Sequence, residues 1–257
     1  MRSLWTGAIG FGLVSIPVKL YSATQQSDLD LDMLDKKDLS NIKFHRINEK
    51  TGKEVPYANI VRAYNYEGQY VVLNDDDFKK ASPEKTKMIE IVEFVEEADV
   101  DSLYYETPYY LEPQKSGEKA YVLLRDALKK TGKTGLATFV LRSKESLALL
   151  KTSGDTLILQ KIRYAQEIRK IEELKIPATT SKPAELKMAI ILIDQLSSKF
   201  DISKFKDTYS DELMKLIAAK SRGKKITAPT MKVVHSRSKD LMEQLKASLD
   251  TKRKKVS

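Results

Sequence analysis

The sequence predicts a mixed, mainly β protein whose chain ends in helices. Short runs rich in β-forming or alternating residues dominate the first two thirds of its 257 residues, and only one strong helical pattern, Glu118–Lys130, interrupts them. A segment of Pro, Thr and Ser, Pro177–Pro183, then marks a boundary, and every later pattern is helical. Seven or more short strands with one good helix favour a β-barrel or sandwich, followed by a helical arm.

The first 21 residues read as two short strands with tight bends. Glycine inside a strand pattern marks a bulge or a close backbone approach, and three such residues occur here, Gly7, Gly10 and Gly12. Residues 41–47 alternate as a further strand, and the turn Asn48–Lys53 makes a hairpin with the short run that follows.

The middle of the chain alternates strands with two helices. Asn74 is expected to cap a short helix, Asp75–Lys80, whose first-turn carboxylates suit the helix dipole. The helix Glu118–Lys130 carries an apolar face and ends at Gly132. The expected strands are Gln69–Leu73, Met88–Val95, Pro108–Leu111, Gly135–Leu141, Leu147–Lys151 and Thr156–Lys161.

The C-terminal third is expected to hold three helices. Glu185–Phe200 is apolar over more than one stripe, so it needs cover on two sides, either within the chain or from a second copy. Ser210 is expected to cap the helix Asp211–Lys220. A short helix around Lys239–Leu249 and the charge run Lys252–Lys255 complete the pattern.

The composition excludes several classes of protein. Apolar residues make up 41% and charged residues 32%, which is typical of a globular chain. Without cysteine there is no disulfide and no thiolate metal site. Three glycines and Pro17 interrupt the apolar stretch at residues 4–18, which argues against a secretory signal, and no run is long enough to span a membrane. We therefore expect a cytoplasmic protein.

The positive charge is concentrated in parts of the chain. The net charge of +9 arises from residues 220–257, which hold 12 basic and three acidic side chains. Within the neutral remainder, residues 36–62 hold seven basic and three acidic side chains, whereas residues 74–106 hold eleven acidic and four basic ones. Such sorting can present a positive face to a partner.

Catalytic and metal sites lack the residues they need. The two histidines, His45 and His235, stand near no nucleophile motif. Thr131–Thr134 resembles the end of a phosphate-binding loop but lacks its first glycine and its preceding strand. Residues 28–32 begin like a calcium loop but lack its later glycine and glutamate. Helix capping explains the carboxylates Asp75–Asp77 better than a nuclease site does. We expect no catalytic residue, metal or cofactor.

The basic residues of the first half can contact a phosphate backbone without reading sequence. Each of them alone is also compatible with an ordinary solvated charge, and no helix carries a base-reading pattern. The candidates are Lys36, Lys37, Lys43, Arg46, Lys50, Lys53 and Arg62.

Several long segments of the chain carry a specific pattern. Besides the first 21 residues, these segments are Asn48–Pro56, Tyr70–Phe78, Pro108–Pro113, Lys119–Leu128, Arg163–Arg169 and Glu185–Ala189. In their order and spacing they resemble bacterial Ku proteins, over about residues 1–220. The resemblance implies a Ku-core β-barrel over residues 1–178 with an inserted bridge at about 22–67. A helical arm at 179–222 and a basic tail at 223–257 would follow.

The resemblance also implies a function. Bacterial Ku forms a ring-shaped homodimer that threads onto double-stranded DNA ends and recruits and stimulates the ATP-dependent DNA ligase of non-homologous end joining, so this chain would act at the nucleoid. We add Lys133 and Arg142 to the expected DNA contacts, and expect a dimer interface at Leu186, Ile190 and Ile193. An end-processing nuclease or lyase, and a general basic chromosome-coating protein, are the alternatives.

Overall fold

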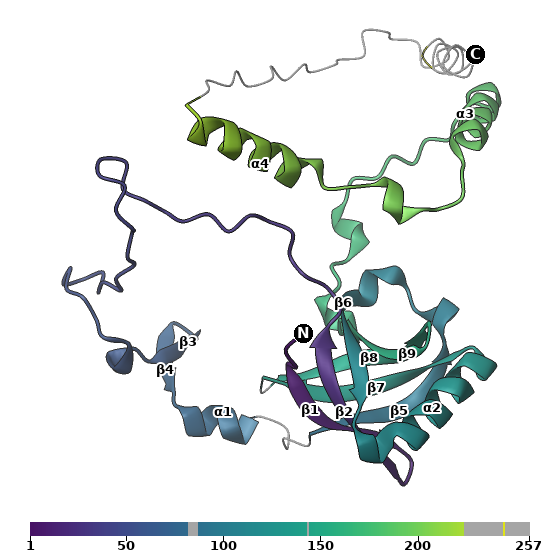
Figure 1. Cartoon of the computed structure of the whole chain (residues 1–257), viewed down its shortest axis with the longest axis horizontal. Coiled ribbons are helices and arrows are strands. Elements are labelled where there is room, and N and C mark those ends of the chain that lie inside the picture. The colour runs from purple at the N-terminus through teal and green to yellow at the C-terminus, as the bar shows by residue number, and fades with distance from the viewer. Residues whose placement is uncertain (82–86, 143, 224–243, 245–257) are drawn as a thin grey trace. The chain divides into compact units, whose positions relative to one another are not determined.

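The computed structural model describes residues 1–81, 87–142, 144–223 and 244, and a closed barrel contains most of its strands (Figure 1). Around the barrel the order is β1-β2-β6-β9-β8-β7-β5; β1 and β5 pair in parallel and the other neighbours are antiparallel. The strands are β1 Trp5–Phe11, β2 Val14–Ser22, β5 Met88–Glu96, β6 Tyr105–Pro113, β7 Lys133–Leu141, β8 Lys144–Ser153 and β9 Thr156–Ile162. The mixed, mainly β fold with a barrel is confirmed.

The first two strands form as the glycine pattern predicts. β1 pairs with β2 along the whole length of β1, and Gly12 turns the chain between them with a left-handed φ of 58°. A Cβ at Gly7 would collide with the Trp5 ring and the carbonyl oxygen of Lys87. The close backbone approach expected from this glycine is therefore present.

Alternating side chains fill the barrel. Ile16, Val18 and Leu20 of β2 are fully buried, while the side chains between them are only half-buried. The helix α2 (Glu118–Thr131) adds Leu124 and Leu128 to this core.

A buried tyrosine hydroxyl ties α2 to two strands. Tyr121 donates a hydrogen bond to the carbonyl oxygen of Leu111 at 2.8 Å and accepts one from the backbone N–H of Leu157 at 2.7 Å. Gly132 ends the helix as predicted, with a left-handed φ of 68° and its N–H bonded to the carbonyl oxygen of Leu128.

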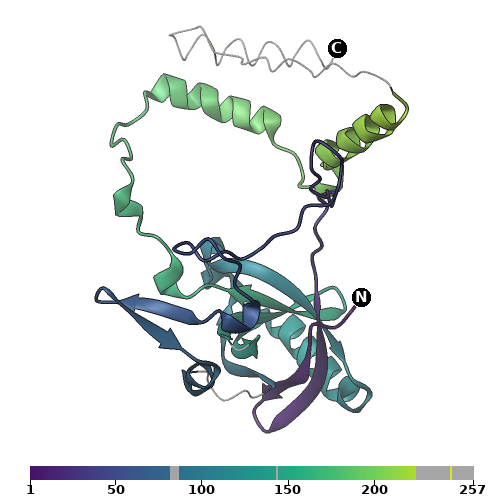
Figure 2. The same cartoon turned by 90° about the vertical axis from the view of Figure 1, so that its left-hand side faces the viewer.

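Residues 23–87 lie between β2 and β5, and part of this insertion forms a hairpin and a helix. β3 (Arg62–Tyr66) pairs with β4 (Gln69–Leu73) in a sheet of two strands (Figures 1 and 2). Glu67 and Gly68 join them with φ of 50° and 86°, as a two-residue hairpin turn requires. α1 (Asp75–Ala81) follows β4. β4 and α1 confirm the prediction, whereas β3 was not expected.

The strand expected at residues 41–47 is absent, and that prediction is wrong. Only isolated bridges occur here, Leu34 with Asn41 and Ile47 with Glu54. Phe44, on the face expected to be apolar, is 79% exposed. Alternation stabilises a strand only where a sheet or core covers one face, and none covers this segment in the described structure.

Two helices follow the barrel, with boundaries that differ from those expected. α3 (Pro183–Leu196) begins two residues early, because proline suits the first helical position, and ends four residues before Phe200. α4 (Thr208–Ser221) is capped by Asp207 rather than by Ser210, since the Asp207 carboxylate accepts the N–H groups of Tyr209 and Ser210. Except for Gln244, the helix expected at 239–249 lies outside the described residues, as does the run 252–255.

Short 3-10 turns connect these elements. They are Tyr57–Asn59, Glu97–Asp99, Ser102–Tyr104, Lys115–Gly117, Ala165–Glu167, Ile171–Glu173 and Ile202–Lys204. The chain divides into two compact units, one of Met1–Gln26 with Asp30–Lys170, the other of Ser27–Leu29 with the chain from Ile171 onward. Among the residues described, none of the helices has the length and apolarity needed to cross a bilayer.

Candidate nucleic-acid interface

Two turns of the insertion each carry two of the cations selected from the sequence, and the turns differ in net charge. In the first, Asp35–Ser40, the Lys37 N–H donates to the Asp35 carboxylate at 2.8 Å. The backbone N–H and the hydroxyl of Ser40 donate to Asp38 and hold the pKa of that carboxyl below its usual value. Two charged carboxylates thus offset Lys36 and Lys37 locally.

The second turn keeps its positive charge. Asn48 Oδ1 accepts the N–H groups of Lys50 and Thr51, both at 3.0 Å, and the Asn48 N–H donates to the carbonyl oxygen of Lys53 at 2.9 Å. These bonds are typical of an Asx turn, so a short polar side chain at Asn48 organises the loop. The predicted turn is therefore present, although the strand before it is not.

Lys43, Arg46 and Lys53 project from this turn and its flanks as exposed side chains. In the described part of the chain, none of them lies within ion-pair distance of a carboxylate. The Arg46 guanidinium lies 5.1 Å from the centroid of the Tyr57 ring, which orients it without using its hydrogen-bond donors. These three side chains are therefore available to bind phosphates.

Arg62 is engaged in the hairpin. Its Nη2 lies 2.8 Å from Asp75 Oδ1, and its guanidinium carbon lies 3.8 Å from the centroid of the Phe78 ring. A phosphate at this position would have to compete with Asp75 for the guanidinium.

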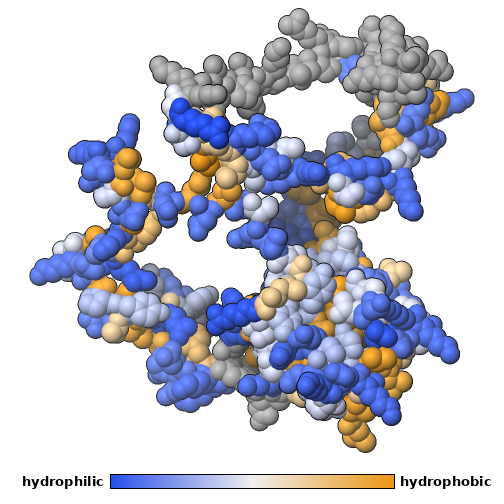
Figure 3. Space-filling view, viewed as in Figure 1, coloured by the Kyte–Doolittle hydropathy of each residue, from blue (hydrophilic) through white to orange (hydrophobic). Residues whose placement is uncertain are grey.

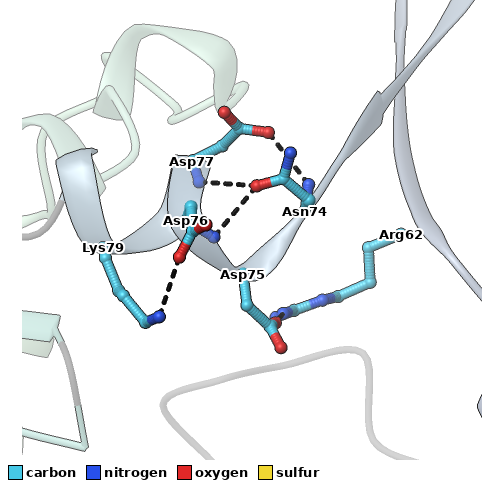
Figure 4. Close-up of polar contacts among 6 residues, drawn as sticks. All are labelled: Arg62, Asn74, Asp75, Asp76, Asp77 and Lys79. Atoms are coloured by element: carbon cyan, nitrogen blue, oxygen red, sulfur yellow. Dashed lines mark hydrogen bonds and ion pairs between the residues drawn. The ribbon is translucent and has the colours of Figure 1, made fainter.

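The carboxylates Asp75–Asp77 lie in the first turn of α1, next to its cap, as the capping interpretation predicts (Figure 4). Asn74 Oδ1 accepts the N–H groups of Asp76 and Asp77, at 2.9 and 3.0 Å, and Asp77 accepts the Asn74 N–H at 2.9 Å. Lys79 donates to Asp76 at 2.8 Å. Each of the three carboxylates thus has its own partner.

A metal cluster and a phosphate-binding loop are both absent from the part of the chain that the structure describes. Within it, no group of three or more His, Cys, Asp or Glu side chains could hold a metal ion. A phosphate-binding loop needs its glycine before a helix, whereas Gly132 stands after α2 and leads into β7.

The two cations assigned to the barrel lie far apart. Lys133 begins β7, where its Nζ is 3.4 Å from Glu96 Oε1, and Arg142 immediately follows the end of that strand. Nine residues of extended chain separate them by about 30 Å. One phosphate cannot bridge these two side chains.

Sequence reasoning missed the neighbours of Arg142. Lys144 and Lys161 line the same cavity as Arg142, at one end of the barrel. Lys144 is close in sequence, but Lys161 comes from β9, and only the pairing of β8 with β9 reveals that it belongs to this group.

The apolar face of α3 has little cover within the chain. Leu186, Ile190 and Ile193 share one side of the helix and are 50%, 49% and 62% exposed. None of the side chains of α3 is buried. Hydrophobic surface is visible on both α3 and α4 (Figure 3). The cover that the sequence requires is therefore absent from the described chain.

Comparisons with known proteins agree with this architecture. A family model described as the Ku70/Ku80 beta-barrel domain matches residues 10–188. The chain is 42% identical over 226 residues to the non-homologous end joining protein Ku of Cupriavidus necator, covering 85% of this chain and 67% of that protein. The protein of the same name from Coxiella burnetii is 38% identical over 262 residues, 98% of this chain and 96% of the relative. That of Bacillus subtilis is 38% identical over 260 residues, 99% and 83%.

Proposed function

The chain belongs to the family of bacterial Ku proteins, and from this premise we propose that it binds double-stranded DNA ends in non-homologous end joining. In this role it neither forms nor breaks a covalent bond. It binds backbone phosphates rather than base edges, and it does so as a homodimer that closes into a ring around the duplex.

The exposed cations of the insertion are the observation that carries this proposal. Lys43, Arg46 and Lys53 project from a turn and its extended flanks, with no carboxylate in ion-pair distance among the described residues. Cations on such loops bind backbone phosphates, and no base-reading helix presents them. Lys36, Lys37, Arg62, Lys133 and Arg142 complete the proposed contacts, with local carboxylates near the first four.

The uncovered face of α3 supports the homodimer. Three large aliphatic side chains that remain about half exposed favour burial against a second apolar surface. In a two-fold pair the same face serves both copies, so one helix face supplies an isologous interface. We propose Leu186, Ile190 and Ile193 as its centre.

We extend the proposal to partners and location by family membership. The ring would recruit and stimulate the ATP-dependent DNA ligase of bacterial end joining and would act at the nucleoid. Ligation of linear DNA by that ligase, with and without this protein, tests the recruitment. An unchanged ligation rate would contradict it.

A plasmid competition tests end binding. A labelled linear duplex is bound to the protein and competed with one plasmid, either closed circular or cut once. A ring loads only over a terminus, so the cut plasmid should compete much better than the closed one. Equal competition would favour a general chromosome-coating protein. Cleavage of the label with divalent metal present would indicate an end-processing nuclease.

A further inference from the structure

A cavity of about 280 Å³ opens at the end of the barrel where β7 and β9 end and β8 begins. Arg142, Lys144 and Lys161 line it together with Tyr109 and Ser146. Mouths of β-barrels are common ligand sites, and a few convergent polar groups decide which ligand they take. This cavity lies entirely within one compact unit of the chain.

Two buried residues bring hydroxyl groups to the cavity. Ser146 is 5% and Tyr109 is 9% exposed, and neither hydroxyl has a hydrogen-bond partner in the described residues. No fully enclosed side-chain N or O atom of the described chain lacks a partner. Both hydroxyl oxygens are therefore accessible, and because both residues line this cavity, a ligand in it can supply the hydrogen-bond partners that the described chain does not.

The charges at the cavity favour an anion. Three cations and no carboxylate line it. Lys161 is 3.0 Å from Glu106 and Lys144 is 3.9 Å from Glu167, so both are partly compensated. Arg142 has no carboxylate within ion-pair distance in the described chain. A bound anion would gain an uncompensated guanidinium and two hydroxyl donors.

We propose that this cavity binds a phosphate monoester, supplied by the terminal phosphate of a broken DNA strand. The inference rests on the proposed function for the source of the phosphate. A monoester carries nearly two negative charges at neutral pH, and its oxygens accept hydrogen bonds from a guanidinium and from hydroxyls. The end of a strand can enter a recessed site, whereas a phosphate inside a continuous backbone is held at the duplex surface.

Three blunt duplexes of one sequence test whether a terminal phosphate occupies the cavity. One carries 5′-phosphates, one carries 3′-phosphates and one has hydroxyl ends only. The wild type should bind one phosphorylated duplex about tenfold tighter than the hydroxyl duplex, the scale of one charge-assisted hydrogen bond. The double variant Arg142→Ala/Ser146→Ala should lose this preference. Lys130→Ala, an exposed cation of α2 outside the cavity, is the matched control and should keep it.

A second measurement separates the cavity from DNA binding as such. Inorganic phosphate, compared with chloride at equal ionic strength, should raise the melting temperature of the wild type more than that of the double variant. Ser146→Ala alone should fold normally, because its hydroxyl has no protein partner to lose. If no duplex binds the wild type, the proposed function is wrong. The phosphate-dependent change in melting temperature then still shows whether the cavity binds phosphate.

The outcomes are distinct. Equal weakening of all three duplexes by the double variant would contradict a terminal phosphate monoester as the ligand and would indicate contact with the internal backbone. If the double variant changes neither duplex binding nor the phosphate-dependent melting shift, the cavity is no phosphate site.

Discussion

α2 and α3 are both fourteen residues long, yet α2 packs into a hydrophobic core and α3 does not. α2 buries Tyr121, Leu124 and Leu128 in the barrel core, whereas none of the side chains of α3 is buried. α3 is nevertheless rich in large aliphatic residues. A helix with such a face is stabilised by packing more than by propensity, so α3 depends on a surface that the described chain does not supply.

The cations show the same contrast. On the barrel, Lys151, Lys161 and Lys129 lie 2.5 to 3.0 Å from carboxylates. On the insertion, Lys43, Arg46 and Lys53 have no such partners among the described residues. These three cations of the barrel unit are paired within the chain, whereas Arg142 at the end of the barrel, the three cations of the insertion and the apolar face of α3 can meet other molecules.

Truncation in the barrel should give the largest effect. Leu150 is fully buried, so Leu150→Ala should lower the free energy of unfolding by about 3 kcal/mol through lost burial and a residual cavity. Urea denaturation followed by circular dichroism measures it. Ile193→Ala, at a position 62% exposed in the single chain, is the control. If Ile193→Ala lowers the free energy of unfolding of the monomeric protein as much as Leu150→Ala does, the contrast between the buried barrel core and the exposed face of α3 is wrong.

A charge on α3 should disrupt the proposed dimer. Ile190→Glu should raise the dimer dissociation constant about 100-fold, because a carboxylate would have to enter an apolar interface. Light scattering at several concentrations measures the mass. Leu123→Glu changes a comparably exposed leucine on α2 and should leave the dimer intact. A dimer that survives Ile190→Glu would place the interface elsewhere.

Charge reversal on the insertion should weaken DNA binding more than tenfold. The triple variant Lys43→Glu/Arg46→Glu/Lys53→Glu replaces three phosphate-binding cations by repulsive charges. The matched control, Lys115→Glu/Lys119→Glu/Lys130→Glu, changes the net charge equally at exposed positions of α2 and the turn before it.

The salt dependence sharpens that test. For about six neutralised phosphates, the logarithm of the wild-type binding constant should fall with the logarithm of salt concentration with a slope of about −5. The insertion variant should show a shallower slope. If the control weakens binding as much as the insertion variant does, overall charge rather than this turn governs the affinity.

The smallest expected effect is on the N-terminal cap of α4, which α2 lacks. No side chain caps α2, whereas Asp207 caps α4. Hydrogen bonds from the hydroxyl and N–H of Ser210 lower the pKa of Asp207 below its ordinary value. Because the folded-state pKa is lowered, the stabilisation is complete above the ordinary value and is lost as the pH falls through the lowered one.

Amide chemical shifts of Tyr209 and Ser210 between pH 5 and pH 2 should follow this loss. Asp207→Asn keeps an oxygen acceptor at the cap but has no carboxyl to titrate, so its shifts should lack the transition. A persisting transition at these amides in Asp207→Asn would assign it to another group.

Local chemistry in the sequence determined much of the fold. Asn74 caps α1, Gly132 ends α2, and β4, β5, β7, β8 and β9 lie where the patterns predicted them, with ends shifted by at most three residues. Each of these signals depends on side chains and backbone angles within a few residues. The resemblance of long segments then identified the family, which the comparisons confirm.

Only the tertiary structure decided where distant segments meet. The alternation at residues 41–47 gives no strand because nothing in the described chain covers Phe44, and β3 exists because β4 pairs with it. Lys161 joins Arg142 through the pairing of β8 and β9. These outcomes depend on contacts between residues that are far apart in the sequence. They could not be predicted from the sequence because the spacing of apolar residues does not specify which surface will bury them.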